Sequence, residues 1–530
     1  MNKFNRSLMT LLFGIPVLMS CTTGNRSVVQ NDNVVAADIL IVNGAVYTGE
    51  LRQAQSLNIA ICQQFICGIY PQNVEVKAKK VLDAAGLIVS PGFIDPHTHS
   101  YQELISQDKN QNLNYLFQGV TTVINGNDGD GPVDLNEASS AFNSAGIGTN
   151  TAFLVGHGSL RRQVMGTAKR YATPAELSDM KALMETAMQQ GALGLSSGLY
   201  YVPGSFATAE EVIELAKIAA KYNGIYDTHL RDESTFNIGF LAALDEAIHI
   251  ARSAKIHLHI AHIKALGVDV WGQSKQAIDK INQARSEGVS ISADQYPWQA
   301  SGTNMRSAVM PKWAMADSEN AFMQRLENPI LIDRIKSEIK ENIRRRGGPS
   351  ALLITASEDK SIVGSTLEQI ARHLGKSDID TVIHLVKQGR TRVASFNMHK
   401  DDIDAFMQQP WVVTSSDGTN GHPRKYASFP QKYQEYVLNS DNLDLPRFIH
   451  SSTGQTADIL GLGDRGYIKV GLKADILLFA PEKYRAEADF KVWDRLSKGV
   501  SHLFVNGQHV IINGEYSGSL AGQFVKRKRE

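Results

Sequence analysis

The sequence predicts an α/β protein: a TIM-type (β/α)8 barrel with a small β-sandwich domain built from both ends of the chain. Two observations predict this class. The middle of the chain alternates short apolar runs with amphipathic stretches, which is typical of parallel βα units. Both ends instead hold short, β-branched segments separated by turn residues. With 530 residues, the chain is long enough to enclose a large core and a second, smaller domain.

Eight apolar runs in the middle of the chain are the predicted barrel strands. They cover residues 92–95, 120–124, 150–155, 192–195, 224–227, 257–261, 289–293 and 411–415. Helices are predicted between them over residues 175–190, 209–222, 240–254 and 273–287. Eight such units close into a barrel whose functional residues gather at the C-terminal ends of the strands. A doubly wound open sheet is the alternative, although no glycine-rich phosphate loop follows the first strand.

The predicted barrel domain covers residues 90–456, and the flanking sandwich covers residues 38–89 and 457–530. Between the seventh and eighth predicted strands, residues 298–410 are too many for a simple connection. This segment contains helical stretches at 321–346, 367–374 and 380–387 and a strand-like run at 351–354. We interpret it as an insertion over the barrel mouth and as a candidate lid.

The N-terminal segment indicates export. A basic start with Lys3 and Arg6 precedes an apolar run over residues 8–19, which is too short to span a bilayer comfortably. The run ends at Leu18-Met19-Ser20-Cys21, which resembles a bacterial lipoprotein signal. We therefore expect a signal peptide over residues 1–21, a lipid on Cys21, a polar tether over residues 22–37, and a lipid-anchored protein in the periplasm. A plain secretory signal cut nearby is the alternative.

Charge and cysteine content exclude several classes of protein. Lys and Arg together number 54, as do Asp and Glu, so there is no basic excess for binding nucleic acid. Only Cys62 and Cys67 remain if Cys21 carries lipid, and no further zinc ligands lie near them. An oxidising compartment permits a disulfide between these two, but we favour two buried thiols.

The residues that follow the predicted strands point to metal chemistry. His97 and His99 follow the first strand, and alternate residues of a strand project to the same side, so both imidazoles can reach one metal ion. His229 follows the fifth strand, His262 the sixth and Asp417 the eighth. Imidazole and carboxylate are the ligands of a catalytic Zn²⁺ that keeps one position open for water. The pattern therefore predicts a metal-dependent hydrolase.

Other polar residues near the strand ends have simpler explanations. Asp128 follows the second strand in an Asn-Asp-Gly stretch and is either a ligand or part of a turn. His157, after the third strand, has a structural, substrate-facing or metal-binding role. His257 and His259 lie deeper in the sixth strand, and we interpret them as packing residues.

Several stretches together resemble the amidohydrolase superfamily, and more narrowly the N-acyl-D-amino-acid deacylases. The run from Pro91 to His99 resembles the metal-binding opening of the superfamily. Further stretches that resemble the deacylases are residues 118–123, 155–161, 191–204, 228–233, 261–264, 294–297, 416–418 and 422–424. The resemblance covers nearly all of the chain after the tether.

The resemblance implies hydrolysis of the amide bond of N-acyl-D-amino acids with one or two Zn²⁺ ions at the barrel mouth. His97, His99 and Asp417 would serve one metal position, and His229 and His262 the second. Asp417 would also take a proton from the attacking water and pass it to the leaving amine. The implied partner is a small-molecule N-acyl amino acid.

The resemblance also implies a set of substrate contacts. Lys264 and Tyr296 match positions that grip the substrate's α-carboxylate. Ser301, by its distance past Tyr296, is a further candidate for this contact, and Arg424 is a candidate selector of the amino-acid side chain.

The chain departs from the deacylase pattern at one ligand. Asp128 stands where these enzymes usually have a bridging cysteine, and a carboxylate is a harder zinc ligand than a thiolate. Two other classes remain open: an amidohydrolase acting on cyclic amides or dipeptides, and a tethered binding protein without catalysis. The cyclic-amide enzymes often carry a carboxylated lysine after the fourth strand, and residues 196–200 contain no lysine.

Overall fold

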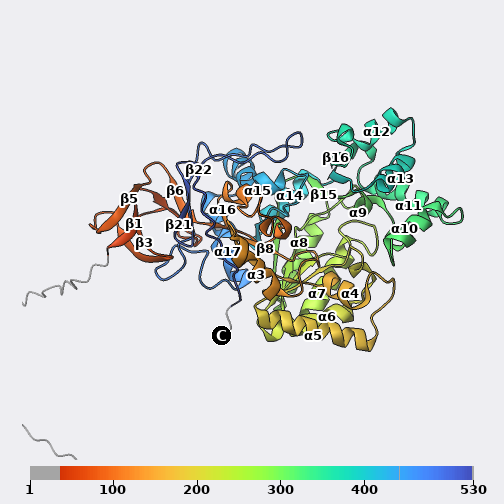
Figure 1. Cartoon of the computed structure of the whole chain (residues 1–530), viewed down its shortest axis with the longest axis horizontal. Helices are drawn as coiled ribbons and strands as arrows, with labels where there is room; N and C mark the ends of the chain where they lie inside the picture. The colour runs from red at the N-terminus through yellow and green to blue at the C-terminus, as the bar shows by residue number, and fades with distance from the viewer. Residues whose placement is uncertain (1–35, 441, 528–530) are drawn as a thin grey trace, which may run out of the picture.

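The computed structural model describes residues 36–440 and 442–527 and is a mixed α/β protein (Figure 1). The predicted signal peptide, the Cys21 lipid site and nearly all of the predicted tether lie outside these residues. Within the described residues, no helix is long and apolar enough to cross a membrane.

Parallel strands form the centre of the molecule and follow one another in chain order. One parallel sheet has the order β7-β8-β9, and a second has the order β10-β11-β12-β13-β14-β18. Only Leu154 separates β9 from β10, and a parallel bridge from Thr98 to Gly418 joins the ends of β7 and β18. The sheets are therefore linked at both sides. Their strands are β7 (Phe93–Asp95), β8 (Val120–Asn125), β9 (Asn150–Phe153), β10 (Val155–Gly156), β11 (Gly194–Gly198), β12 (Ile225–His229), β13 (His257–Ile260), β14 (Ile291–Gln295) and β18 (Val412–Thr414).

Amphipathic helices cover these strands, and each predicted helix is present within about a turn of its predicted bounds. In α5 (Pro174–Gln190), Thr173 and Glu176 form a reciprocal capping box, and Gly191 ends the helix in the left-handed conformation. Helices α5, α6 and α7 bury Met, Leu, Ile and Ala side chains in one continuous core with the strands. The helices on and between these strands are α1 (Tyr101–Leu104), α2 (Leu113–Leu116), α3 (Leu135–Ala145), α4 (His157–Met165), α6 (Ala209–Lys221), α7 (Phe240–Ala254), α8 (Ser274–Ser286), α15 (Arg424–Lys432), α16 (Leu445–Ser452) and α17 (Gly454–Leu460).

The two ends of the chain meet in one sheet, which lies at the left of Figure 1. Its order is β22-β21-β20-β19-β6-β2-β3-β1-β5, with β4 paired to β3, and the antiparallel pair β6–β19 joins the N-terminal strands to the C-terminal ones. The strands are β1 (Ala37–Val42), β2 (Ala45–Val46), β3 (Gln55–Cys62), β4 (Phe65–Pro71), β5 (Ala78–Asp83), β6 (Ile88–Pro91), β19 (Ile476–Phe479), β20 (Val500–Val505), β21 (Gln508–Ile512) and β22 (Glu515–Tyr516).

The expectation of two free thiols in this sheet is wrong, because Cys62 and Cys67 form a disulfide. The two cysteines lie on the β3–β4 hairpin, where the register shifts between Ala60 and Ile61. This bulge places Cys67 near Cys62 with a Cα–Cα distance of 5.7 Å, which suits a disulfide. The position of a bulge could not be predicted from the alternation of residues.

The segment between β14 and β18 forms its own small α/β unit, at the upper right of Figure 1. Antiparallel strands in the order β15-β17-β16 pack with helices around a separate apolar cluster. One predicted helical stretch, 321–346, is two helices, because Pro329 interrupts it. The elements are β15 (Ala300–Asn304), β16 (Leu352–Ala356), β17 (Arg392–Phe396), α9 (Met305–Val309), α10 (Glu319–Glu327), α11 (Ile332–Arg345), α12 (Leu367–Leu374), α13 (Asp378–Gln388) and α14 (Lys400–Met407).

Candidate metal centre

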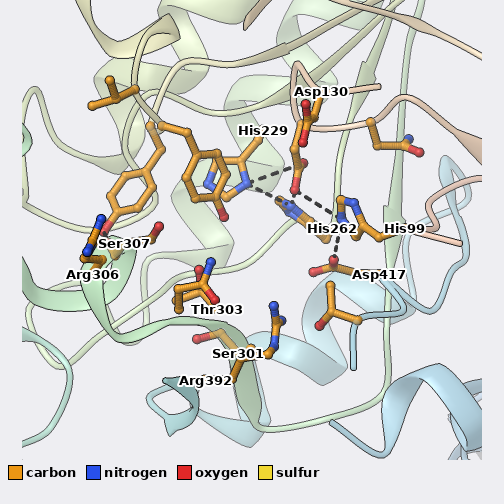
Figure 2. Close-up of a pocket in the computed structure, with 18 of the residues that line it drawn as sticks. His99, Asp130, His229, His262, Ser301, Thr303, Arg306, Ser307, Arg392 and Asp417 are labelled. Carbon is orange, nitrogen blue, oxygen red and sulfur yellow. Dashed lines mark hydrogen bonds and ion pairs between the residues drawn. The ribbon is translucent and has the colours of Figure 1, made fainter. Parts of the chain in front are cut away.

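Polar side chains from the C-terminal ends of five central strands meet in one cavity of about 1140 Å³, which the insertion covers from the other side (Figure 2). His97 and His99 follow β7, His229 is the last residue of β12, and Asp417 follows β18. Together with two residues after β8 and β13, these are the predicted metal ligands: His97, His99, Asp128, His229, His262 and Asp417.

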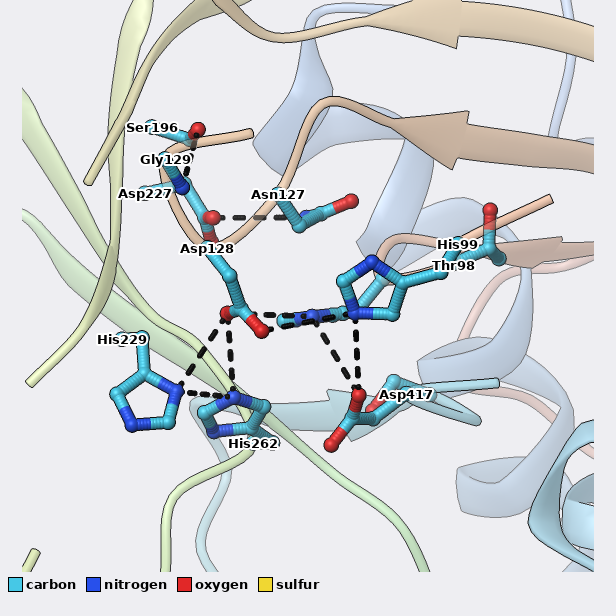
Figure 3. Close-up of polar contacts among 12 residues, drawn as sticks. Thr98, His99, Asn127, Asp128, Gly129, Ser196, Asp227, His229, His262 and Asp417 are labelled. Atoms are coloured by element: carbon cyan, nitrogen blue, oxygen red, sulfur yellow. Dashed lines mark hydrogen bonds and ion pairs between the residues drawn. The ribbon is translucent and has the colours of Figure 1, made fainter. Parts of the chain in front are cut away.

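The Asp128 carboxylate lies at the centre of this cluster and faces four imidazoles (Figure 3). Its oxygens are 3.4 Å from His97 Nε2 and 3.5 Å from His99 Nε2 on one side. On the other side, Oδ1 is 3.6 Å from His229 Nδ1 and 3.3 Å from His262 Nε2. A carboxylate in this place can bridge two cations, one on each side.

Asp417 closes one side of the cluster. Its Oδ1 is 3.4 Å from His99 Nε2 and 3.8 Å from His97 Nε2, and its Oδ2 is 2.8 Å from the Arg424 guanidinium. One carboxylate oxygen therefore faces the histidines, and the arginine binds the other.

Two overlapping sets of donor atoms could each hold a cation. In each set, all ligand atoms lie within 4.8 Å of one another. The first set is His97, Asp128, His262 and Asp417, and the second is His229, Glu233 and His262. His97 is fully buried, and neither of its ring nitrogens has a hydrogen-bond partner among the described residues; the same is true of Asp128 Oδ1. Buried nitrogen and oxygen atoms of this kind fit a metal ion as their missing partner.

Three of the proposed ligands have left-handed backbone conformations, which is uncommon for residues other than glycine. The φ angles are 58° at Asp128, 36° at His262 and 45° at Asp417. Each of these residues lies two or three positions after the end of a strand. Left-handed residues cluster at functional sites, where the surrounding structure holds them in place.

Comparisons with known proteins agree with this geometry. Residues 80–305 match the family model described as the amidohydrolase family. A D-aminoacylase of Alcaligenes xylosoxydans xylosoxydans is 28% identical over 517 residues, which cover 92% of this chain and 98% of that protein. The N-acyl-D-aspartate deacylase of the same organism is 29% identical and covers 83% of this chain and 85% of its own length.

A solved structure is similar along nearly the whole chain. It is the N-acyl-D-glutamate deacylase of Bordetella bronchiseptica, in complex with zinc and a phosphonate inhibitor that mimics the tetrahedral intermediate. The TM-score is 0.80 at 25% identity, over 93% of this chain and 100% of that chain. Residues 80–305 therefore match the amidohydrolase family, and the fold of nearly the whole chain is similar to that of a deacylase.

The electrostatics of this candidate metal centre favour ionised carboxylates beside the imidazoles. Burial alone would raise the pKa of Asp128, but His97 and His262 hold it well below its usual range. Burial also opposes ionisation of Asp417, and Arg424 and His262 hold its pKa far below normal. Both acids are therefore negatively charged at neutral pH, as cation ligands must be.

The predicted substrate contacts have different surroundings. Lys264 Nζ is already bound, at 2.6 Å from Glu233 Oε1 and 2.6 Å from His262 Nδ1. The Tyr296 hydroxyl is buried without a hydrogen-bond partner among the described residues, and the Arg424 guanidinium lies 4.7 Å above the Tyr296 ring. Ser301 Oγ is 3.1 Å from the side-chain amide of Asn397. All four side chains line the cavity.

Two acidic residues near the ligands were not identified from the sequence. Glu233 Oε2 is 3.6 Å from His229 Nε2, and its Oε1 is 3.3 Å from His262 Nδ1. Asp294 Oδ2 is 3.8 Å from His97 Nδ1, on the far side of that ring from the cavity. The spacing of four residues between His229 and Glu233 is a signal that the sequence did carry.

Two other histidine expectations have clear outcomes. His259 does not pack against apolar groups alone: Nδ1 is 2.7 Å from Ser292 Oγ, and Nε2 is 3.0 Å from Asp294 Oδ2. His257 shares the same Ser292 hydroxyl at 2.7 Å. His157 Nε2 is hydrogen-bonded to Glu211 Oε1 at 2.7 Å, and burial lowers the pKa of the imidazole, so its role in the structure is this buried hydrogen bond.

Proposed function

We propose that this protein hydrolyses the amide bond of N-acyl-D-amino acids in a zinc-dependent reaction, releasing a carboxylate and a D-amino acid. The observation that carries the proposal is the convergence of four imidazoles and two carboxylates in one cavity. The relatives support the substrate class, since they are a D-aminoacylase and deacylases of N-acyl-D-aspartate and N-acyl-D-glutamate. The preference for the D configuration rests on these relatives.

His97, His99 and Asp417 would hold one Zn²⁺ ion, and His229 and His262 would hold a second. Asp128 lies between the two groups and would contact both ions, where a thiolate is usual. A Zn²⁺ ion bound there would polarise the amide carbonyl and lower the pKa of a bound water. Asp294 Oδ2 lies 3.8 Å behind His97 Nδ1, where a carboxylate commonly supports a metal-bound histidine.

Asp417 is the proposed general base. Its pKa lies far below neutrality, because Arg424 and His262 overcome the effect of burial, so it is ionised at neutral pH. It takes a proton from the attacking water and passes it to the nitrogen of the leaving amine. Arg424 fixes the carboxylate through the oxygen that does not face the histidines.

The substrate's α-carboxylate is proposed to bind at Tyr296 and Arg424. The Tyr296 hydroxyl and two guanidinium nitrogens of Arg424, Nε and NH1, have no hydrogen-bond partner among the described residues. The 2.8 Å contact of Arg424 with Asp417 is an ion pair without hydrogen-bond geometry. Lys264 is held by Glu233 and His262, so it contributes positive charge beside the carboxylate, with Ser301 at the edge of the same subsite.

The finer organisation of the chain is part of the proposal. A closed eight-stranded barrel over residues 90–456 is supported by the parallel bridge between Thr98 and Gly418. A β-sandwich over residues 38–89 and 457–530 is supported by the pairing of β6 with β19, and residues 298–410 form a lid-like insertion. Export and lipid attachment at Cys21 are supported by the basic, apolar and Cys-terminated N-terminal sequence.

The variant Asp417→Asn tests the function. Loss of the base should reduce turnover of N-acetyl-D-amino acids by about 10³-fold or more, while the variant still binds zinc measurably by elemental analysis. Asp130→Asn is the matched control, because this exposed carboxylate lines the same cavity but pairs with Arg162. Turnover by Asp417→Asn at the control's rate would remove the proposed base.

A further inference from the structure

The charged residues that line the cavity do not balance one another. Each of four basic residues is paired with an acid: Lys264 with Glu233, Arg424 with Asp417, Arg306 with Glu319, and Arg162 with Asp130. Four further basic residues line it without an ion pair to any residue in the described part of the chain: Lys312, Arg346, Arg390 and Arg392. Arg390 is exposed and donates to Asn304 Oδ1 at 3.2 Å, which sets it apart from the other three. All three belong to the insertion between β14 and β18.

Lys312 and Arg346 meet at the ring of Tyr200. The ammonium of Lys312 lies 3.6 Å from the ring centroid and donates to the Ser307 carbonyl oxygen at 2.9 Å. Arg346 is 2% exposed and donates to neutral groups, the Ala308 carbonyl oxygen at 2.8 Å and the Tyr200 hydroxyl at 3.3 Å. Burying a guanidinium without a carboxylate partner is costly. Such an arrangement fits a site where an anion binds.

The two cations also change the pKa of Tyr200. Burial would raise the pKa of the Tyr200 phenol, but Lys312 and Arg346 outweigh burial and lower it. Asp232, whose negative charge favours the Lys312 ammonium, accepts backbone N–H groups of Ser234 at 2.9 Å and Gly239 at 3.0 Å. Asp232 is therefore occupied elsewhere.

Arg392 provides a third cation in the same cavity. Figure 2 shows its side chain extending from β17 into the space that Asp417 and Thr303 also face. Burial is the main cause that lowers the pKa of Arg392 to about 10, and the charges of Arg424 and Arg390 add to it. No hydrogen bond of this guanidinium to another described residue is present.

We propose that Lys312, Arg346 and Arg392 form a subsite for a second carboxylate, so that the preferred substrates carry an anionic group in addition to the α-carboxylate. This proposal rests on the proposed deacylase function and narrows its substrate class. The second carboxylate belongs either to an acidic amino-acid side chain or to an acidic acyl group, since both would lie next to the scissile amide.

The position of the subsite suits such a substrate. The ring of Tyr200 lies 5.6 Å from the ring of His229, and Lys312 lies against this same tyrosine. One aromatic ring therefore separates the ammonium from the metal ligands. A carboxylate a few bonds from an amide carbonyl beside the histidines can reach it. The insertion thus supplies the cations, while the strand ends supply the metal ligands.

The experiment compares matched pairs of substrates with the zinc-loaded, full-length protein. N-acetyl-D-glutamate against N-acetyl-D-glutamine tests an acidic side chain, and N-succinyl-D-alanine against N-butyryl-D-alanine tests an acidic acyl group. We expect kcat/KM to be at least about tenfold higher for the anionic member of one pair, because a hydrogen bond to a charged group is worth this much or more. The pair that shows the preference identifies which group carries the carboxylate.

Variants link the preference to the cations. Arg392→Met and Lys312→Met should each reduce the ratio of anionic to neutral kcat/KM by about tenfold. Arg372→Met, an exposed arginine of α12 outside the cavity, should leave both rates and their ratio unchanged. An equal loss on both members of a pair would overturn the subsite, as would a wild-type ratio near one in both pairs.

A binding measurement separates failure of the subsite from failure of the proposed function. If no N-acyl-D-amino acid is hydrolysed, the deacylase proposal fails, and calorimetry with glutarate and butyrate then tests the subsite alone. Tighter binding of glutarate, weakened by Arg392→Met, would support a dicarboxylate site. Equal binding of both acids would reject it.

Discussion

Two buried lysines of α15 should respond to the same substitution in opposite directions. Lys425 is 2% exposed and pairs with Glu103 Oε1 at 2.5 Å. Lys432 is 1% exposed, and its ammonium donates to the Thr414 hydroxyl at 2.9 Å without an ion pair among the described residues. We predict that Lys432→Met stabilises the protein, whereas Lys425→Met destabilises it.

The stabilisation expected from Lys432→Met follows from the pKa of Lys432, which burial and the charge of Arg447 lower from 10.5 to about 7. At about 1.4 kcal/mol per unit, the buried ammonium costs at most about 4 kcal/mol at neutral pH. Above pH 10.5 the lysine is neutral in both states, and between pH 7 and 10.5 only the unfolded chain holds the proton. Wild-type stability should therefore rise with pH through this window, and the advantage of Lys432→Met should shrink.

The destabilisation expected from Lys425→Met comes from the loss of the ion pair with Glu103. Lys425→Met would leave Glu103, whose side chain is 14% exposed, with Asn420 as its remaining polar contact. Removing one member of a buried pair costs about 3 kcal/mol at the lower end of the usual range. The substitution should thus destabilise the protein by about this amount at pH 7.

Urea unfolding of the three proteins at pH 7 and pH 10, followed by tryptophan fluorescence, measures these effects. Methionine fills nearly the same volume as lysine, so packing changes little in either variant. The reasoning is refuted if both variants shift in the same direction, or if the difference between wild type and Lys432→Met does not depend on pH.

Three further predictions concern the metal centre and the hairpin. Asp294→Asn should weaken zinc binding by about 10–100-fold, measured by competition with a chelating dye, because Asp294 lies 3.8 Å behind His97; unchanged affinity would contradict its supporting role. Asp128→Cys should give the cobalt-loaded protein a thiolate-to-cobalt absorption band that wild type lacks, and no new band would mean that residue 128 does not touch the metal. Replacing both Cys62 and Cys67 by alanine should cost about 2 kcal/mol of stability by denaturant unfolding, as for a short loop with a sequence separation of 5, and an equal midpoint would show that the disulfide contributes nothing.

The parts of the fold that follow from periodicity could be predicted from the sequence. The central strands are fully buried, and several of them, such as β8 and β18, are rich in β-branched residues. Helices such as α5 carry their own start and stop signals in Thr173, Pro174 and Gly191. Pairing between distant segments could not be predicted in this way. The bulge that brings Cys67 to Cys62 depends on the register of β3 and β4, which the alternation of residues does not specify.

The residues of the candidate site also fall into two groups: those that the sequence pattern could place and those that only tertiary packing places. His97, His99, His229, His262 and Asp417 directly follow or end strands, so the rule that strand ends gather was enough to bring them together. Lys312, Arg346 and Arg392 lie far apart in a segment of mixed helices and strands, and only the three-dimensional packing of the insertion places them in the cavity. Sequence therefore indicates the reaction more readily than it indicates the substrate.

The Asn-Asp-Gly and Ser-Asp-Gly stretches show why a turn and a ligand are not competing explanations. Asp128 and Asp417 each have a left-handed backbone, which alone costs about 1 kcal/mol or more for a residue with a Cβ atom. The glycine after each is required by close approach: a Cβ at Gly129 would lie 2.8 Å from the Gly198 backbone nitrogen, and one at Gly418 would lie 2.2 Å from the Tyr115 hydroxyl. Glycine in place of either aspartate would relieve the backbone but remove a carboxylate. These turns therefore place a charged side chain where turn preference alone would favour glycine or asparagine, which is the pattern expected when ligand geometry decides the residue.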